Sequence, residues 1–277
     1  MDYEAILESV VSIAHEAGGI IAQRFPRSAL DHVGFKGVVN PVTETDTAVE
    51  GLIRSRLEDR FPDHRILAEE SGGDEWRDAG PPIWLIDPLD GTNNFAHGFP
   101  HVGVSLALVE EQQPVVGVIY DPLRDETFAG TVGGGAFLNA EAIQVTDVEQ
   151  LSDGFLATGF PYDRRTASDN NVERLDHFLR RSQGVRRAGA AVLDLCYVAC
   201  GRFDGFWEIR LHPWDVAAGI LIVREAGGEA TNFGGGHDCV SGREISASNG
   251  RIHRQMLEVI RAGANAPLPD RTEKTGS

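Results

Sequence analysis

The sequence predicts a layered α/β or α+β protein in which two halves meet near residues 140–150. Three features lead to this prediction: helical spacing at the start of the chain, strands separated by turns in the middle, and apolar helices that alternate with short strands afterwards. The 277 residues are 42% hydrophobic, which is enough for one large domain or two tightly joined halves. We expect an α+β half over 1–145, an α/β half over 146–265 and a flexible tail over 266–277, where the chain is polar and contains proline and glycine.

Two helices are predicted before residue 65. Residues 3–25 and 47–61 both repeat apolar side chains at helical spacing, and the break at Asn40-Pro41 separates them. The apolar positions are Ile6, Val10, Ile13, Ala14, Ala17 and Ile21 in the first helix, and Val49, Leu52, Ile53 and Leu57 in the second.

Short buried strands are predicted over residues 65–68 and 83–86. Each runs directly into carboxylates, at Glu69-Glu70 and at Asp87. Further strands at 104–109, 115–120 and 127–130 suggest an antiparallel meander. In the second half we expect strands at 155–157 and 205–208 and helices at 172–181, 190–199 and 216–226.

The formal charge of −17 argues against sequence-independent nucleic-acid binding, which requires Lys and Arg to neutralise phosphates. No apolar run reaches the roughly 18–20 residues needed to cross a bilayer, and the first residues lack the basic start of a signal peptide. We therefore expect a cytoplasmic protein with no membrane partner.

Three cysteines, an odd and small number, do not form a disulfide framework. Cys196 and Cys200 lie four residues apart among apolar side chains, with no neighbouring His or Cys that would complete a zinc site. Packing in the core is the expected role of this pair.

The segment Asp87–Thr92 has the chemistry of a cation site. A buried strand ends in Asp87, Pro88 fixes the backbone, and the turn through Asp90-Gly91 returns a second carboxylate toward the first. A helix that begins at Gly91 or Thr92 would direct free N–H groups toward the same space and bind an anion. Paired carboxylates beside a phosphate-sized pocket suit Mg²⁺. An ordinary Asp-Gly turn is the alternative.

Two further acidic elements support a cation site. Glu69 and Glu70 follow the preceding strand, and Asp215 precedes the small-residue helix start at Ala217-Ala218-Gly219. Asp215 alone would be interpreted as a helix N-cap, which is compatible with a carboxylate that also faces a metal.

Together these segments resemble the signatures of the inositol monophosphatase family. The matching runs are Asn40 to Asp46, Ala68-Glu69-Glu70-Ser71, Trp84 to Phe95, and Trp214 to Gly219 with Glu225-Ala226-Gly227-Gly228. Their order and spacing agree over residues 3–262. The resemblance implies a layered αβαβα sandwich of the inositol monophosphatase and fructose-1,6-bisphosphatase type. It also implies Mg²⁺-dependent, lithium-sensitive hydrolysis of a phosphate monoester, and a homodimer.

The resemblance also implies roles for individual residues. Glu69, Asp87 and the carbonyl of Leu89 would hold one Mg²⁺, and Asp87, Asp90 and Asp215 a second. A third, weaker ion would use Glu69, and Thr92 with Asp46 would orient and help deprotonate the attacking water, with no covalent intermediate. The implied substrate contacts are Asp90, Gly91, Thr92, Gly189, Ala190, Ala191, Glu208 and Asp215.

The resemblance favours inositol 1-phosphate as substrate. Fructose 1,6-bisphosphate, histidinol phosphate, 3′-phosphoadenosine nucleotides and a broad range of sugar phosphates stay open, because Asn40 and Ala190, near the substrate, and Asn93 depart from the family's usual residues. Glu208 favours a neutral polyol, since a carboxylate would repel a second phosphate. His97, His101 and His212 flank the motifs, but a metal-activated water needs no histidine base.

Two other classes of function can be compared with this one. Phosphatases of the haloacid dehalogenase class need two Asp separated by one residue and a downstream lysine, whereas Asp87 and Asp90 are three apart and only Lys274 follows them. A non-catalytic dimeric scaffold that binds a protein partner is disfavoured, because every implied ligand carboxylate is intact.

Overall fold

The computed structural model describes residues 1–25, 33–35, 41–73, 75–77 and 80–262. In the first half the helices are α1 (Tyr3–Arg24), α2 (Glu44–Arg60) and α3 (Thr92–Ala96). The strands of this half are β1 (Val33–Phe35), β2 (Pro41–Thr43), β3 (Arg65–Ala68), β4 (Gly72–Gly73), β5 (Ile83–Asp90), β6 (Gly103–Glu110), β7 (Gln113–Asp121), β8 (Glu126–Thr131), β9 (Gly135–Leu138) and β10 (Glu141–Ala142).

The second half contains the 3-10 turn η1 (Leu151–Asp153) and four helices, α4 (Val172–Leu179), α5 (Ala191–Ala199), α6 (Pro213–Glu225) and α7 (His253–Ala262). Its strands are β11 (Phe155–Thr158), β12 (Gly184–Arg186), β13 (Gly205–Ile209), β14 (Glu229–Thr231) and β15 (Glu244–Ser248).

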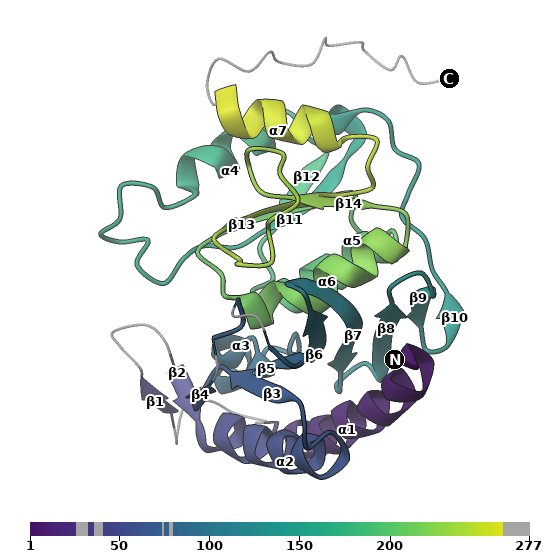
Figure 1. Cartoon of the computed structure of the whole chain (residues 1–277). Helices are drawn as coiled ribbons and strands as arrows, with labels where there is room; N and C mark the ends of the chain where they lie inside the picture. Colours follow the sequence, from purple (N-terminus) through teal and green to yellow (C-terminus); the bar gives the residue numbers. More distant parts are fainter. Residues whose placement is uncertain (26–32, 36–40, 74, 78–79, 263–277) are drawn as a thin grey trace.

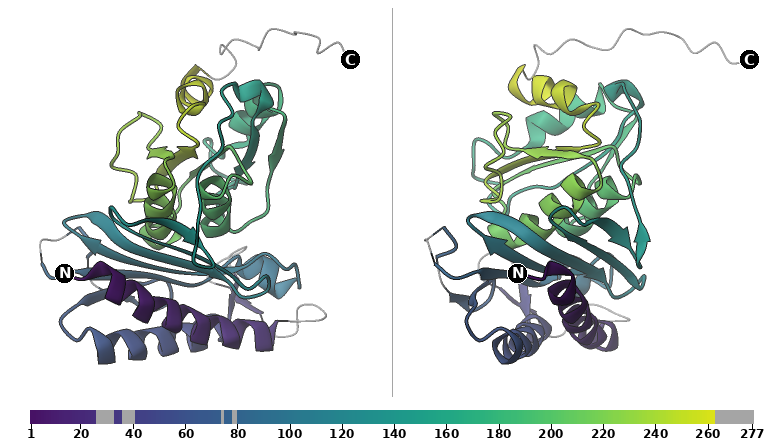
Figure 2. Two further views of the ribbon diagram at one scale, coloured as in Figure 1. Left: turned by 90° about the vertical axis from the view of Figure 1, so that its right-hand side faces the viewer. Right: turned by 45° about the vertical axis from the view of Figure 1, so that its right-hand side comes forward.

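Two large sheets and three layers of helices build the molecule, and β1 and β2 form a separate two-stranded antiparallel sheet (Figures 1 and 2). An eight-stranded sheet has the order β10-β9-β8-β7-β6-β5-β3-β4, and a five-stranded sheet has the order β12-β11-β13-β15-β14. Helices α1 and α2 cover the outer face of the larger sheet, α5 and α6 lie between the sheets, and α4 and α7 cover the outer face of the smaller sheet. This is the αβαβα sandwich that the resemblance implied.

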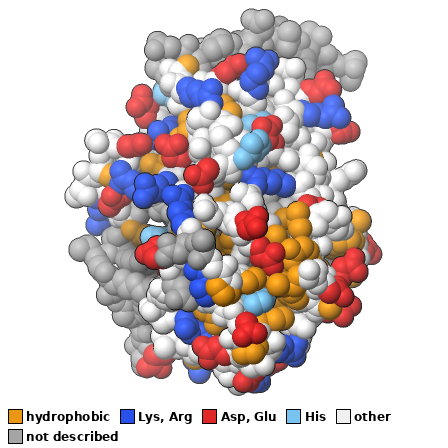
Figure 3. Space-filling view, viewed as in Figure 1, with side chains coloured by type: hydrophobic (Ala, Val, Ile, Leu, Met, Phe, Trp, Pro, Cys, Tyr) orange, Lys and Arg blue, Asp and Glu red, His pale blue; other side chains and the backbone are white. Residues whose placement is uncertain are grey.

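Hydrophobic burial explains the layers. One core cluster joins α5 and α6 to both sheets, a second joins α1 and α2 to the eight-stranded sheet, and a third lies beneath α4 and α7. The predicted apolar positions of α1 are all buried, as expected for a helix with one face on a sheet. Figure 3 shows acidic side chains scattered over the visible face, consistent with the charge of −17.

The predicted helices and strands are present with shifted boundaries, whereas β12, β14, β15 and α7 were not predicted. The antiparallel meander is confirmed from β5 to β10. Helix α2 begins at Glu44 and α6 at Pro213, each three residues before the predicted start. Apolar periodicity begins later than the helices do, because α2 opens with polar residues and α6 opens with Pro213-Trp214-Asp215 before its apolar run. The predicted contributions of Asn40 and of the tail over 266–277 lie outside the described residues.

Helix α1 differs from one expectation. Its 22 residues are long and apolar enough, by length and composition alone, to span a membrane. In this structure the apolar side of α1 is buried against the eight-stranded sheet, which is also the pattern of a core helix.

The cysteines occupy the core, as expected. All three are free thiols, and Cys196 and Cys239 are buried. Cys196 belongs to the cluster between the sheets, and Cys200 packs against it.

Candidate active site

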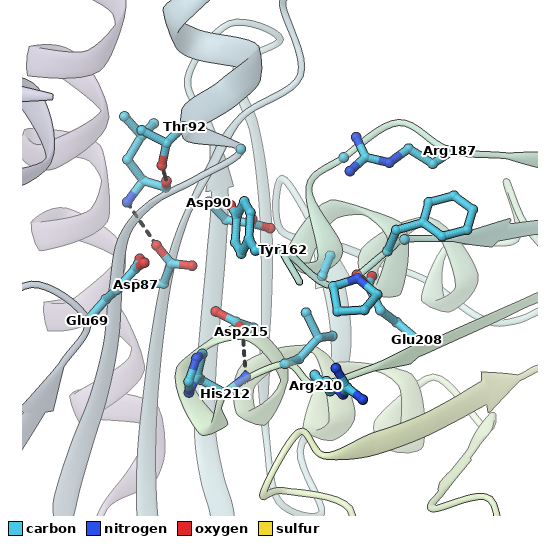
Figure 4. A pocket seen from close by; sticks show the side chains of 18 residues that line it. Glu69, Asp87, Asp90, Thr92, Tyr162, Arg187, Glu208, Arg210, His212 and Asp215 are labelled. Atoms are coloured by element: carbon cyan, nitrogen blue, oxygen red, sulfur yellow. Dashed lines mark hydrogen bonds between the residues drawn. The ribbon is translucent and has the colours of Figure 1, made fainter. Parts of the chain in front are cut away.

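A single pocket collects most of the predicted site residues from both halves of the chain. Its lining includes Glu69, Asp87, Leu89, Asp90, Gly91, Thr92, Gly189, Ala191, Glu208 and Asp215 (Figure 4). Two predicted residues lie behind this surface. Asp46 is buried beneath Thr92, and Ala190 is buried with its Cβ 3.4 Å from the position a Cβ would take on Gly91.

Strand pairing brings the first two carboxylates together. β3 and β5 are parallel, and Ala68 pairs with Ile86, so that Glu69 and Asp87 leave the same edge of the sheet. The amide of Glu69 donates to the carbonyl oxygen of Ile86 at 3.1 Å. Carboxyl ends of parallel strands commonly bind ligands, and here they are occupied by acids.

Local hydrogen bonding and an irregular strand pairing define the turn after Asp87. The Leu89 amide donates to Asp87 Oδ1 at 3.0 Å, and the pairing of β5 with β6 shifts register between Asp87 and Asp90. Gly91 has φ +89°, and a Cβ there would lie 2.8 Å from the His101 carbonyl oxygen. Only glycine fits this position, which places the Asp90 carboxylate beside the start of α3.

Thr92 and Asp46 form the predicted pair. Thr92 Oγ1 lies 3.2 Å from Asp46 Oδ1 and 3.1 Å from the Leu89 carbonyl oxygen. A hydroxyl has one proton and donates to one acceptor at a time. When it donates to Asp46, the Leu89 carbonyl is released and the Thr92 oxygen can accept a hydrogen bond from a water molecule.

Asp215 is a residue of the helix and not its N-cap, which corrects the N-cap interpretation. The N-cap of α6 is His212, Pro213 begins the helix, and Asp215 occupies the third position. Asp215 Oδ2 accepts from the His212 amide at 2.7 Å, so the carboxylate points back over the first turn toward the pocket. The prediction placed the helix start too late because it followed the apolar residues from Val216 onward.

Asp90 connects the two halves. Its Oδ2 accepts from the Val192 amide at 2.8 Å, at the start of α5. The residue before α5, Ala190, provides no side-chain cap. Asp90 therefore takes the place of an N-cap side chain and stabilises α5 from the neighbouring strand.

The other end of the pocket contains Glu208 and Arg187, with Gly159 against Glu208. A Cβ on Gly159 would lie 2.2 Å from both Glu208 carboxylate oxygens, so the carboxylate packs directly on this glycine. Tyr162 retains 48% exposure and stands over Asp90 in Figure 4, while Arg187 extends over the pocket from the other side.

Burial and neighbouring negative charges raise the pKa values of carboxyl groups in the pocket. Burial raises the pKa of Asp87 well above its ordinary value, and the charges of Glu69, Asp90 and Asp215 raise it further. Burial, followed by the charges of Glu69 and Asp90, also raises the pKa of Asp215. Burial raises the pKa of Asp90 to about 6, although the amides of α5 and Arg187 oppose this shift. Like charges in a desolvated site disfavour ionisation.

The chemistry of these carboxylates suits a divalent cation. Glu69, Asp87, Asp90 and Asp215 line one pocket. The raised pKa values of Asp87 and Asp215 reflect burial and repulsion from neighbouring carboxylates, both of which a bound cation would relieve. Within the described ranges, no group of three or more His, Cys, Asp or Glu side chains is arranged so that it could hold a metal ion. Backbone amides donate to one oxygen each of Asp87 and Asp215, and Asp90 accepts from the amides of Gly91, Ala191 and Val192.

Glu208 and His101 have different environments. Burial, with a smaller contribution from Asp90, raises the pKa of Glu208 to about 8, so its carboxyl group retains a proton at neutral pH. Burial lowers the pKa of His101 to about 4. The neutral His101 ring faces Asp194, with Nε2 4.0 Å from Oδ1, and is not among the pocket-lining residues.

The sequence patterns did not identify Glu50, Asn94, Tyr162 and Asp194 as residues of the site or its surroundings. Asn94 Nδ2 donates to the carbonyl oxygens of His101, Ala188 and Gly189 at 2.8, 3.0 and 3.3 Å, which ties α3 to the loop before α5. Glu50 follows Asp46 by one helical turn, and this spacing could have identified it. No sequence signal identifies Tyr162, which reaches the pocket through the irregular segment after β11.

Residues 2–264 match the model of the inositol monophosphatase family. The chain belongs to the inositol monophosphatase family. A protein named inositol-1-monophosphatase from Synechocystis is 46% identical over 225 residues, which cover 80% of this chain and 77% of that protein. A protein named Nus factor SuhB from Haemophilus influenzae is 39% identical, covering 92% of this chain and 96% of that protein.

Solved structures agree with the fold. The inositol monophosphatase from Anabaena (Nostoc) superposes with a TM-score of 0.85 at 40% identity, covering 96% of this chain and 98% of that one. An inositol monophosphatase from Thermotoga maritima gives a TM-score of 0.84 at 33% identity, with coverages of 94% and 98%. As a member of this family, the protein is a phosphoric monoester hydrolase.

Proposed function

We propose that this protein is a Mg²⁺-dependent hydrolase of a small polyol phosphate, with inositol 1-phosphate as the preferred substrate. The observation that supports this most directly is that Asp90 lies between two ends of one pocket. One end, the metal end, consists of Glu69, Asp87 and Asp215, and the other, the alcohol end, consists of Glu208 and Arg187. A phosphate monoester likewise has two parts, an anionic phosphate that suits the metal end and an alcohol that suits the other end.

The metal end would hold the cation through side chains already directed into the pocket. Glu69, Asp87, Asp90, Asp215 and the Leu89 carbonyl supply hard oxygen ligands of the kind Mg²⁺ prefers. When bound, Mg²⁺ lowers the pKa of a water molecule and neutralises charge on the phosphate and the leaving oxygen.

The chain's own residues would orient the nucleophile. The Thr92 hydroxyl donates to Asp46 and accepts from the attacking water. As that water gives a proton to Thr92 Oγ1, the proton of the Thr92 hydroxyl would pass to the Asp46 carboxylate, which is 1% exposed. Asp46 lies in the first turn of α2 and Thr92 begins α3, so secondary structure holds both side chains in place.

The alcohol end suits hydroxyl groups. A protonated Glu208 both donates and accepts hydrogen bonds, which fits the neighbouring hydroxyls of a polyol. The expected repulsion between Glu208 and a second phosphate on the substrate does not apply when Glu208 is uncharged, and Arg187 would attract such a phosphate. The preference for inositol 1-phosphate over fructose 1,6-bisphosphate is therefore supported mainly by relatives that are named inositol-1-monophosphatase.

One assay tests the proposal. Phosphate release from inositol 1-phosphate, fructose 1,6-bisphosphate and histidinol phosphate is measured with Mg²⁺ and with EDTA. We expect inositol 1-phosphate to have the highest kcat/KM, and EDTA to abolish turnover of all three. Activity that persists in EDTA would contradict the metal mechanism, and a higher kcat/KM for either other ester would contradict the substrate assignment.

The family resemblance also leads us to propose a homodimer, which sedimentation of the purified protein would test. A role as a protein-binding scaffold is a second candidate, favoured by relatives named Nus factor SuhB. Loss of turnover in Asp90→Asn without loss of partner binding would separate the two roles.

A further inference from the structure

Helix α2 presents a row of polar residues to the metal end of the pocket. Asp46, Glu50 and Arg54 are spaced by four residues and therefore lie on one side of the helix. Asp46 contacts Thr92, and Arg54 Nη1 donates to Ser71 Oγ at 3.0 Å. Glu50 lies between them.

Glu50 is a buried carboxylate whose partners are main-chain amides. It is 3% exposed, and its two oxygens accept from the amides of Glu70 at 2.8 Å and Ser71 at 3.0 Å. Hydrogen bonds from backbone N–H groups to a carboxylate are among the stronger kinds in proteins. Both of these bonds end on the two residues directly after Glu69.

The backbone of Glu69 is therefore held from both sides. Its own amide is bonded to Ile86 of β5, and the next two amides are bonded to Glu50. The chain turns sharply here, because Ala68 pairs with Gly72 in the antiparallel contact of β3 and β4. Without Glu50, the amides of Glu70 and Ser71 would lose their acceptor and the turn would be free to shift.

We propose that Glu50 is a positioning residue that sets the metal affinity of the site by fixing the backbone that carries Glu69. The inference rests on the proposed function, since it assigns Glu69 to a bound divalent cation. Glu50 acts through the main chain, whereas Asp46 on the same helix acts on Thr92. One helix thereby positions both a cation ligand and the hydroxyl that orients water.

A purely structural role for Glu50 makes a different prediction. If Glu50 only stabilised the fold, its loss would lower the thermal midpoint by the same amount with and without metal. If Glu50 positions Glu69, its loss also weakens metal binding, and the rise in midpoint produced by Mg²⁺ becomes smaller. The two roles differ in a measurement that does not involve turnover.

The variant Glu50→Gln has nearly the same shape but one acceptor oxygen, and its NH₂ group faces an amide. Mg²⁺ binding to the metal-free protein is measured by calorimetry, together with the thermal midpoint at several Mg²⁺ concentrations. We expect about tenfold weaker binding than in the unmodified chain, typical for loss of an outer-shell partner. Glu50→Asp keeps both oxygens on a shorter side chain, and we expect an intermediate affinity.

Glu58→Gln is the matched control, because Glu58 lies on the same helix with a side chain 62% exposed; we expect unchanged Mg²⁺ affinity. Glu50→Gln with unchanged affinity would overturn the inference, and if that variant does not fold, unchanged affinity in Glu50→Asp would do so. Failure of the unmodified protein to bind Mg²⁺ would instead overturn the proposed function.

Discussion

The metal end and the alcohol end of the pocket are built in different ways. At the metal end, Asp87 and Asp215 each accept a hydrogen bond from an amide within three residues along the chain. At the alcohol end, Glu208 packs on Gly159, forty-nine residues away, and no described donor is hydrogen-bonded to its carboxyl group. The metal end is therefore rigid through local structure, and the alcohol end depends on tertiary packing. This difference predicts that chemistry is harder to change than substrate choice.

Asp90 belongs to both ends, and its replacement should have the largest effect. Asp90→Asn removes a ligand charge and weakens the cap of α5. We expect kcat/KM for inositol 1-phosphate to fall by about 10³ at saturating Mg²⁺. Asp125→Asn, at an exposed turn before β8, serves as the control. An Asp90→Asn enzyme within threefold of the unmodified one would refute the assignment of Asp90.

Thr92→Val affects the metal end alone. The change removes the hydroxyl and keeps the shape of the side chain, so Asp46 loses its contact with the nucleophilic water. We expect kcat to fall by about 10² while KM changes little, as for the loss of an acid–base group. Steady-state kinetics separates the two parameters. A change confined to KM would show that Thr92 binds substrate and does not orient water.

Gly159→Ala affects the alcohol end alone. The added methyl group displaces the Glu208 carboxyl group, which can move because it is the end of a flexible side chain. We expect KM for inositol 1-phosphate to rise by about tenfold, with Mg²⁺ affinity unchanged. The same variant assayed with fructose 1,6-bisphosphate shows whether selectivity changes. If Gly159→Ala and the unmodified enzyme had equal KM values for inositol 1-phosphate, this would argue against Glu208 as a substrate contact.

The smallest effect concerns stability and pH. In the metal-free protein the raised pKa values of Asp87, Asp90, Asp215 and Glu208 mean that the folded state binds more protons than the unfolded state. The free energy of unfolding therefore falls as pH rises from about 5 to about 8. We expect the thermal midpoint to fall by a few degrees over this range, and Mg²⁺ to raise it more at about pH 8 than at about pH 5. A metal-free midpoint that rises with pH would contradict the assigned shifts.

The sequence alone determined much of the metal end. Glu69 directly after β3 and the acids in the second half of β5, with a proline and a glycine beside them, are local features, and the parallel register of Ala68 with Ile86 then places Glu69 and Asp87 together. The same reasoning found Asp215, although it misplaced the start of α6 because it followed the apolar run from Val216 onward, whereas the resemblance to the family supplied the pair of Asp46 and Thr92.

Only the tertiary structure decided the alcohol end and the supports behind both ends. Tyr162 and Gly159 reach the pocket through an irregular segment with no periodicity to interpret, and the protonation of Glu208 follows from burial that no residue pattern encodes. Glu50 and Asn94 act on main-chain atoms of distant segments, whose positions depend on how the layers pack. The cation ligands lie in short motifs held by local hydrogen bonds, so a sequence pattern can identify them. Contacts between segments far apart in the chain form only once the protein is folded, and no local pattern predicts them.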